Sequence, residues 1–94
     1  MTGQTPPSLL IVEDDEALAR TLRRSFERRG YCVATASSPK EVEELLLKDS
    51  FAYAVVDLKL GAASGLTCVQ MLSRKDARTR IVVLTGFASI ATAV

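Results

Sequence analysis

The sequence contains no histidine and no tryptophan, and only two of its 94 residues are cysteines. Without histidine the chain lacks imidazole for acid–base catalysis and for the common zinc sites. Its apolar runs are all far shorter than the roughly 20 residues that a membrane-spanning helix needs. Residues 1–7 show no charged-then-apolar secretory pattern. We therefore expect a cytoplasmic protein with a flexible N-terminal lead at residues 1–7.

The sequence also lacks an excess of charge of either sign, because it has 12 basic and 11 acidic residues and a net charge of +1. This balance gives no electrostatic basis for binding nucleic acid or an anionic membrane. The hydrophobic content of 48% suffices for a packed core, and the length suits one small domain. Cys32 and Cys68 are expected to be reduced and buried rather than joined in a disulfide.

Strand patterns and helix patterns alternate along the chain. The predicted strands are residues 8–12, 31–36, 52–58 and 81–85. The predicted helices are residues 16–29, a segment opened by the capping box Ser38-Pro39-Lys40-Glu41, residues 64–74, and the start of a helix at residues 89–94. In the helix at 64–74, Leu66, Val69 and Leu72 form the expected packing face. This alternation is typical of an α/β fold with a parallel sheet and helices on both faces.

Oxygen-bearing side chains stand at the carboxyl ends of three of the predicted strands: Glu13 and Asp14, then Asp57, then Thr85. The carboxyl ends of parallel strands share one edge of the sheet, where ligands bind. Clustered carboxylates repel one another, and Mg²⁺, or Mn²⁺ in its place, offsets that repulsion. We predict Asp14 and Asp57 as direct metal ligands and Glu13 as an outer ligand acting through water. The backbone carbonyl of Lys59 is the predicted third direct ligand.

Acidic residues after a strand can also cap the next helix, and Asp15 and Glu16 suit that role. Capping does not account for Asp57, the only carboxylate on its predicted strand. An aspartate beside a divalent cation can act as a nucleophile towards phosphorus. Thr85 could donate its hydroxyl to a phosphoryl oxygen, or it could simply be a β-branched residue that ends a strand.

Four motifs in combination resemble the receiver domain of two-component response regulators. They are Val12-Glu13-Asp14-Asp15, Val55-Val56-Asp57-Leu58-Lys59-Leu60, Ser64-Gly65-Leu66 and Val83-Leu84-Thr85-Gly86. The last thirteen residues are especially similar to the RegA/PrrA/ActR group, which joins a receiver to a helix-turn-helix DNA-binding domain and controls redox-responsive genes. The resemblance implies a flavodoxin-like fold with strand order 2-1-3-4-5. It also implies that a sensor histidine kinase phosphorylates Asp57, that Glu13 and Asp14 hold Mg²⁺, and that Thr85 is the switch hydroxyl.

The chain departs from the family in one respect: the family's lysine and aromatic switch residue lie on a fifth strand, which would follow Val94. We therefore expect an incomplete receiver at residues 8–94, with strand order 2-1-3-4 and the fifth strand and last helix missing. Lys59 and Lys75 do not replace the lysine, because neither ends a fifth strand. Residues 81–84 would then form an exposed sheet edge, open to a homodimer or a domain swap.

Two further questions stay open at this point. The arginine-rich face of the helix at 16–29 is either a solvated surface or, with Leu18, a docking surface for the kinase. The alternative function is a phosphorylation-independent dimerisation or domain-swap module. A metal-dependent phosphohydrolase fits poorly, because Lys59 stands where haloacid-dehalogenase-type phosphatases have a second aspartate. We expect a regulatory domain rather than an enzyme, with DNA contacted only through an output domain absent here.

Overall fold

The computed structural model describes residues 5–58, 62–84 and 90–93. In chain order the elements are β1 (Ser8–Val12), α1 (Glu16–Arg28), β2 (Cys32–Ala36), α2 (Pro39–Leu46), β3 (Tyr53–Asp57), α3 (Ala62–Lys75), β4 (Arg80–Leu84) and β5 (Ile90–Ala93). The strands form one sheet in the order β2-β1-β3-β4-β5. The first four strands are parallel, which confirms the predicted α/β fold and the order 2-1-3-4.

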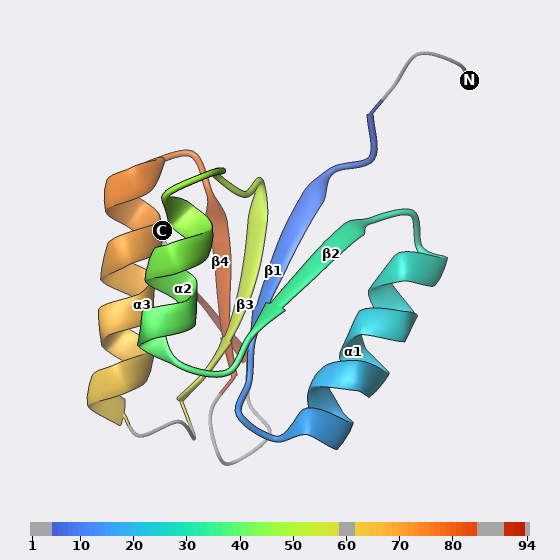
Figure 1. The fold of residues 1–94 in the computed structure, drawn as a ribbon, viewed down its shortest axis with the longest axis horizontal. Helices are drawn as coiled ribbons and strands as arrows, with labels where there is room; N and C mark the ends of the chain where they lie inside the picture. Colours follow the sequence, from blue (N-terminus) through green and yellow to red (C-terminus); the bar gives the residue numbers. More distant parts are fainter. Residues whose placement is uncertain (1–4, 59–61, 85–89, 94) are drawn as a thin grey trace.

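Helices lie on both faces of this sheet, with α1 on one side and α2 and α3 on the other (Figure 1). Because side chains alternate between faces along a strand, β1 supplies both layers. Leu10 and Val12 are fully buried in the larger core, with α2 and α3. Leu9 and Ile11 belong to the smaller core, with α1. An all-apolar β1 is therefore what a strand covered on both faces requires.

α1 and α2 begin where the sequence signals predict. The Asp15 carboxylate accepts a hydrogen bond from the Leu18 backbone N–H at 3.1 Å and so caps α1. The Ser38 hydroxyl accepts one from the Glu41 N–H at 3.3 Å, with Pro39 in the first turn of α2. Gly30 follows α1 with φ +97°, a left-handed conformation that favours glycine.

Residues 90–93 form a strand, so the helix predicted at residues 89–94 is wrong for the described residues. β5 pairs antiparallel with β4, from Ile81 opposite Ala93 to Leu84 opposite Ile90. The pairing satisfies backbone groups along β4, whereas a single short turn of helix would gain few hydrogen bonds. The prediction that β4 would be an exposed edge is therefore also wrong, because β5 covers that edge.

The remaining differences from the predictions are smaller, and they concern one helix boundary and the exposure of two side chains. α3 begins at Ala62, two residues before the predicted start at Ser64. Leu66 is 55% exposed although it was expected to pack, because α3 buries the face that carries Cys68 and Leu72 instead. Cys32 is exposed, contrary to prediction, because it begins a strand that pairs only with β1 in the described chain. None of the described helices is long and apolar enough to cross a membrane.

Candidate functional site

Strand register brings Glu13 and Asp57 together at the carboxyl edge of the sheet, which is its lower end in Figure 1. β1 and β3 pair with Val12 opposite Val56, so the residues that follow them are neighbours. The Glu13 backbone N–H donates to the Ala36 carbonyl at 2.9 Å, which ties Glu13 to the end of β2. Glu13 and Asp57 are each only 3% exposed. Two predicted site residues thus lie side by side and buried.

The two carboxylate oxygens of Glu13 have different surroundings. Oε2 accepts a hydrogen bond from the Asp15 N–H at 3.0 Å. Oε1 is buried and has no hydrogen-bond partner among the described residues. Burial raises the pKa of Glu13 from 4.5 to about 7, and the neighbouring Asp57 adds to the rise. The hydrogen bond from Asp15 opposes the rise, and Asp14 reinforces it.

A buried acceptor without a donor is costly, and two ionised carboxylates cannot donate to each other. Either a proton on Glu13 or a cation beside Oε1 relieves this cost. A donor set made of carboxylates suits Mg²⁺, which proteins often bind through one or two carboxylates with water completing the coordination. In the described ranges no group of three Asp, Glu, Cys or His side chains could hold a metal ion. Glu13 and Asp57 supply two buried carboxylates, a number that suits a divalent cation which keeps several of its waters.

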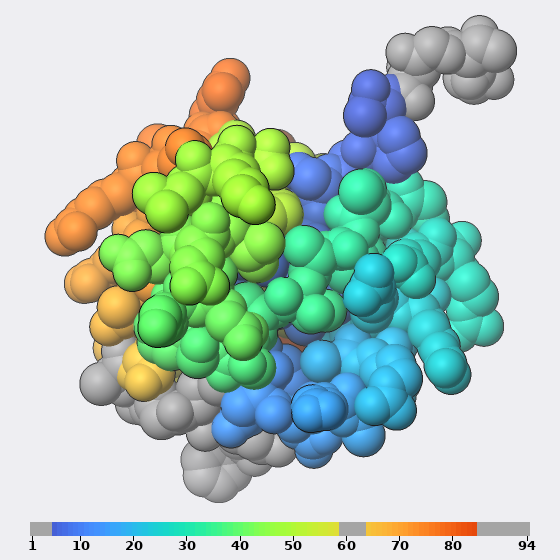
Figure 2. Space-filling model, in the orientation of Figure 1, coloured from blue at the N-terminus to red at the C-terminus, as the bar shows by residue number. Residues whose placement is uncertain are grey.

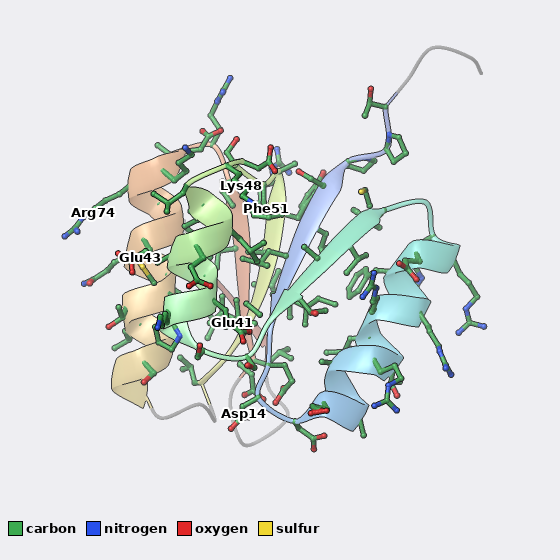
Figure 3. All side chains as sticks on the ribbon, viewed as in Figure 1. Asp14, Glu41, Glu43, Lys48, Phe51 and Arg74 are labelled. Atoms are coloured by element: carbon green, nitrogen blue, oxygen red, sulfur yellow. The ribbon has the colours of Figure 1, made fainter. Side chains whose placement is uncertain are left out.

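The remaining predicted site residues fall into two groups. Asp14 lies just beyond the end of β1, where its side chain is exposed (Figure 3). Lys59 and Thr85 lie outside the described residues. Asp15 caps α1 and Glu16 stands in its first turn, which confirms the capping interpretation for both.

A polar groove of about 330 Å³ adjoins Glu13. It is lined by the carboxyl end of β2 and by side chains of α1 and α2, among them Arg20 and Arg23. Figure 2 shows α1, β2 and α2 meeting on one face of the molecule. Glu41 also lines the groove; its carboxylate accepts the Ser37 N–H at 2.7 Å, which lowers the pKa of Glu41. The sequence did not predict this groove, because no local pattern shows that α1 and α2 both border the carboxyl end of β2.

Gly65 allows α3 to approach the residue that follows Asp57. A Cβ at position 65 would lie 2.5 Å from Leu58 Cδ2 and 3.3 Å from Leu58 Cα. We expect Gly65→Ala to lower the free energy of unfolding by about 1–3 kcal/mol, because a clash with the Leu58 side chain and a tight contact with its Cα outweigh the helix propensity of alanine. Urea denaturation measures this change, and the exposed Ser73→Ala on the same helix is the control. A Gly65→Ala protein as stable as the wild type would contradict the close packing.

Comparison with known proteins gives a consistent result. The sequence matches the response regulator receiver domain family over residues 9–94. It is 45% identical to the photosynthetic apparatus regulatory protein RegA of Cereibacter sphaeroides, covering 93% of this chain and 47% of RegA. It is 44% identical to the acid tolerance regulatory protein ActR of Sinorhizobium medicae, covering 93% of this chain and 45% of ActR. The chain thus spans about half the length of the curated relatives it matches.

A solved structure of a response regulator from Burkholderia pseudomallei is also similar. It superposes with a TM-score of 0.79 at 41% identity, covering 88% of this chain and 49% of that one. It was crystallised with a phosphorylated aspartic acid, a calcium ion and citrate. The similarity to RegA and ActR agrees with the group that residues 82–94 resemble.

Proposed function

Because this chain belongs to the response regulator receiver domain family, we propose that Asp57 accepts a phosphoryl group from a sensor histidine kinase in the presence of Mg²⁺. The observation that carries the proposal is the buried pair of Glu13 and Asp57, in which Glu13 Oε1 has no partner in the described chain. A buried carboxylate oxygen that lacks a donor, as Glu13 Oε1 does in the described chain, is poised for a cation. The calcium ion and phosphorylated aspartate of the similar Burkholderia pseudomallei regulator support the same chemistry.

In the proposed reaction an Asp57 carboxylate oxygen attacks phosphorus, and the bond between phosphorus and the donor's leaving group breaks. The electron pair of that bond departs with the leaving group. Glu13 and Asp14 hold the cation beside Asp57, and Mg²⁺ when bound supplies positive charge against the phosphoryl oxygens. The proposal keeps the Lys59 backbone carbonyl as a metal ligand and the Thr85 hydroxyl as the switch hydroxyl, which would donate a hydrogen bond to a phosphoryl oxygen.

The role of the whole protein follows from its relatives. RegA and ActR carry names of regulatory proteins, so a regulatory rather than an enzymatic role fits the chain. We propose that phosphorylation of Asp57 controls a DNA-binding output in the whole protein. The closed β4 edge gives no support to the alternative, a dimerisation or domain-swap module.

The test is the intact mass of the protein after incubation with Mg²⁺ and acetyl phosphate. We expect one added phosphoryl group on the wild type and none on Asp57→Asn, whose amide is a poor nucleophile. A chelator added before the donor should also prevent the gain. Asp49→Asn, which changes an exposed aspartate before β3, is the matched control and should still gain the group. An unmodified wild type, or a modified Asp57→Asn, would contradict the proposal.

A further inference from the structure

α1 carries a local excess of positive charge, which the nearly balanced charge of the whole chain conceals. Five arginines stand in α1 and at its C-cap, Arg29, against the two glutamates Glu16 and Glu27. Arg23 is paired with Glu27, with 3.1 Å between Nε and Oε2. None of the other four arginines forms an ion pair with another described residue. Four guanidinium groups therefore remain against the carboxylate of Glu16.

Three of these arginines, Arg20, Arg24 and Arg28, form a row along the outer side of α1. They are four residues apart, so in a helix of about 3.6 residues per turn they follow one another at steps of about 6 Å. The inner side of α1 packs on the sheet through Leu22 and Phe26. Each arginine of the row stands two positions from Leu22 or Phe26, which is about 200° around the helix. The arginine row therefore points away from the sheet, and its three side chains are exposed.

The surface between these arginines shows that they are neighbours. A depression on α1 is lined by Arg24, Glu27 and Arg28. The carboxylate of Glu27 in this depression is already paired with Arg23. Arg20 stands at the other end of the row, where it also lines the polar groove beside Glu13. The row extends over about 12 Å of the helix axis.

The composition of this outer side indicates what it can bind. A stable protein interface has an apolar centre, and a helix that lies in a membrane buries an apolar face. The apolar stripe of α1 is used on the sheet, and the large apolar side chains exposed among the described residues, Leu47 and Leu66, lie elsewhere. Single-stranded nucleic acids stack their bases on aromatic rings, but the one ring of α1, Phe26, packs on the smaller core. The phosphates of a duplex need none of these features, because a guanidinium group binds phosphate through paired hydrogen bonds.

We propose that the arginine row binds the phosphate backbone of duplex DNA without regard to base sequence. A duplex carries one negative charge per about 1.7 Å of its axis, so several phosphates lie within the length of the row. Arg20, Arg24 and Arg28 each donate to one phosphate and displace the cations that neutralise it. This departs from the expectation that DNA is contacted only through an output domain. Binding of this kind does not depend on phosphorylation of Asp57.

The test is the fluorescence anisotropy of an end-labelled DNA duplex titrated with the unphosphorylated protein at several salt concentrations. Three phosphate contacts predict a slope of about −2.7 when the logarithm of the affinity is plotted against that of the salt concentration. The affinity should therefore fall roughly 40-fold between about 50 and 200 mM salt. Two duplexes of unrelated sequence should give the same curve, because phosphate contacts carry no sequence information.

Two variants with the same change of charge separate the row from general attraction. Arg24→Gln, at the centre of the row, should weaken binding and reduce the slope to about −1.8. Arg74→Gln is the matched control and should leave the slope at about −2.7. Its exposed side chain stands on α3, on the other side of the sheet from α1 (Figure 1, Figure 3). Both changes are at exposed positions, so both variants should stay folded.

Three results would overturn the proposal. The first is the absence of binding, or of a salt dependence, at about 50 mM salt. The second is an equal effect of Arg24→Gln and Arg74→Gln, which would mean that the contact is not made by the row. The third is tighter binding to vesicles of anionic lipid than to DNA at the same salt concentration, which would assign the row to a membrane surface.

Discussion

Replacing Glu13 by glutamine is expected to stabilise the metal-free protein by up to about 3 kcal/mol at about pH 8. The wild-type pKa rises from 4.5 to about 7 on folding, chiefly because the side chain is buried and also because Asp57 is near. Between these values the unfolded chain loses the Glu13 proton while the folded chain keeps it. The stability of the wild type therefore falls as the pH rises through this window, and it levels off once both states are ionised.

Glutamine removes that ionisation, so the variant should lack this loss of stability. Urea denaturation at several pH values, with a chelator present, measures both curves. Mg²⁺ should restore stability to the wild type at high pH, because an ion that binds only the folded state stabilises it. Glu43→Gln, an exposed change on α2, is the control and should leave the wild-type slope intact. Parallel curves of stability against pH for the wild type and Glu13→Gln would show that burial and Asp57 do not raise the pKa of Glu13.

The pH range distinguishes this effect from that of other carboxylates. Ser37 lowers the pKa of Glu41, and Arg78 lowers that of Asp76. A group with a lowered pKa stabilises the folded state above its ordinary pKa and loses this contribution as the pH falls. Their effects on stability therefore appear at acid pH, below the range from 4.5 to about 7 in which Glu13 changes the stability.

Leu10→Ala is expected to lower the free energy of unfolding by about 3–5 kcal/mol. Leu10 is fully buried on β1, between β2 and β3, and belongs to the larger core. The helices α2 and α3 on that face cannot collapse freely onto the cavity that the shorter side chain would leave. A domain of this length has a total stability of about 5–14 kcal/mol, so the loss is a large share.

The change in the urea midpoint at constant slope measures the effect of Leu10→Ala. Leu47→Ala removes the same atoms from a side chain that is 80% exposed, so it is the matched control. It should change stability by no more than about 0.5 kcal/mol. Similar losses in both variants would mean that the core is loosely packed around Leu10.

Much of the site could be predicted because two local patterns suffice for it. Val12 and Val56 each end an apolar stretch, and each is followed by an acidic residue. The alternation of strands and helices predicts that these strands are parallel, so their carboxyl ends meet at one edge. The structure confirms that Glu13 and Asp57 are neighbours there. No knowledge of distant packing was needed for this part.

The failed predictions depend on contacts between distant segments. Residues 90–93 are too few for hydrophobic periodicity to separate a helix from a strand, and the backbone of β4 decides in favour of a strand. The exposure of Leu66 depends on which face of α3 meets α2 and the sheet. Glu13 is held in its buried position by the hydrogen bond from its backbone N–H to the Ala36 carbonyl. That burial and the neighbouring Asp57 raise its pKa. A residue's position after a strand does not reveal these surroundings.

The place of β1 in the middle of the sheet also affects how the chain is made. β1 and β2 are synthesised early, but the second neighbour of β1 is complete only at Asp57. At about 5–20 residues per second, the chain between the ends of β2 and β3 takes roughly 1–4 s to synthesise. During that interval Leu10 and Val12 have not met their partners on β3 and α3. β1, which lies inside the finished sheet, thus keeps one edge unpaired from its own synthesis until β3 is complete.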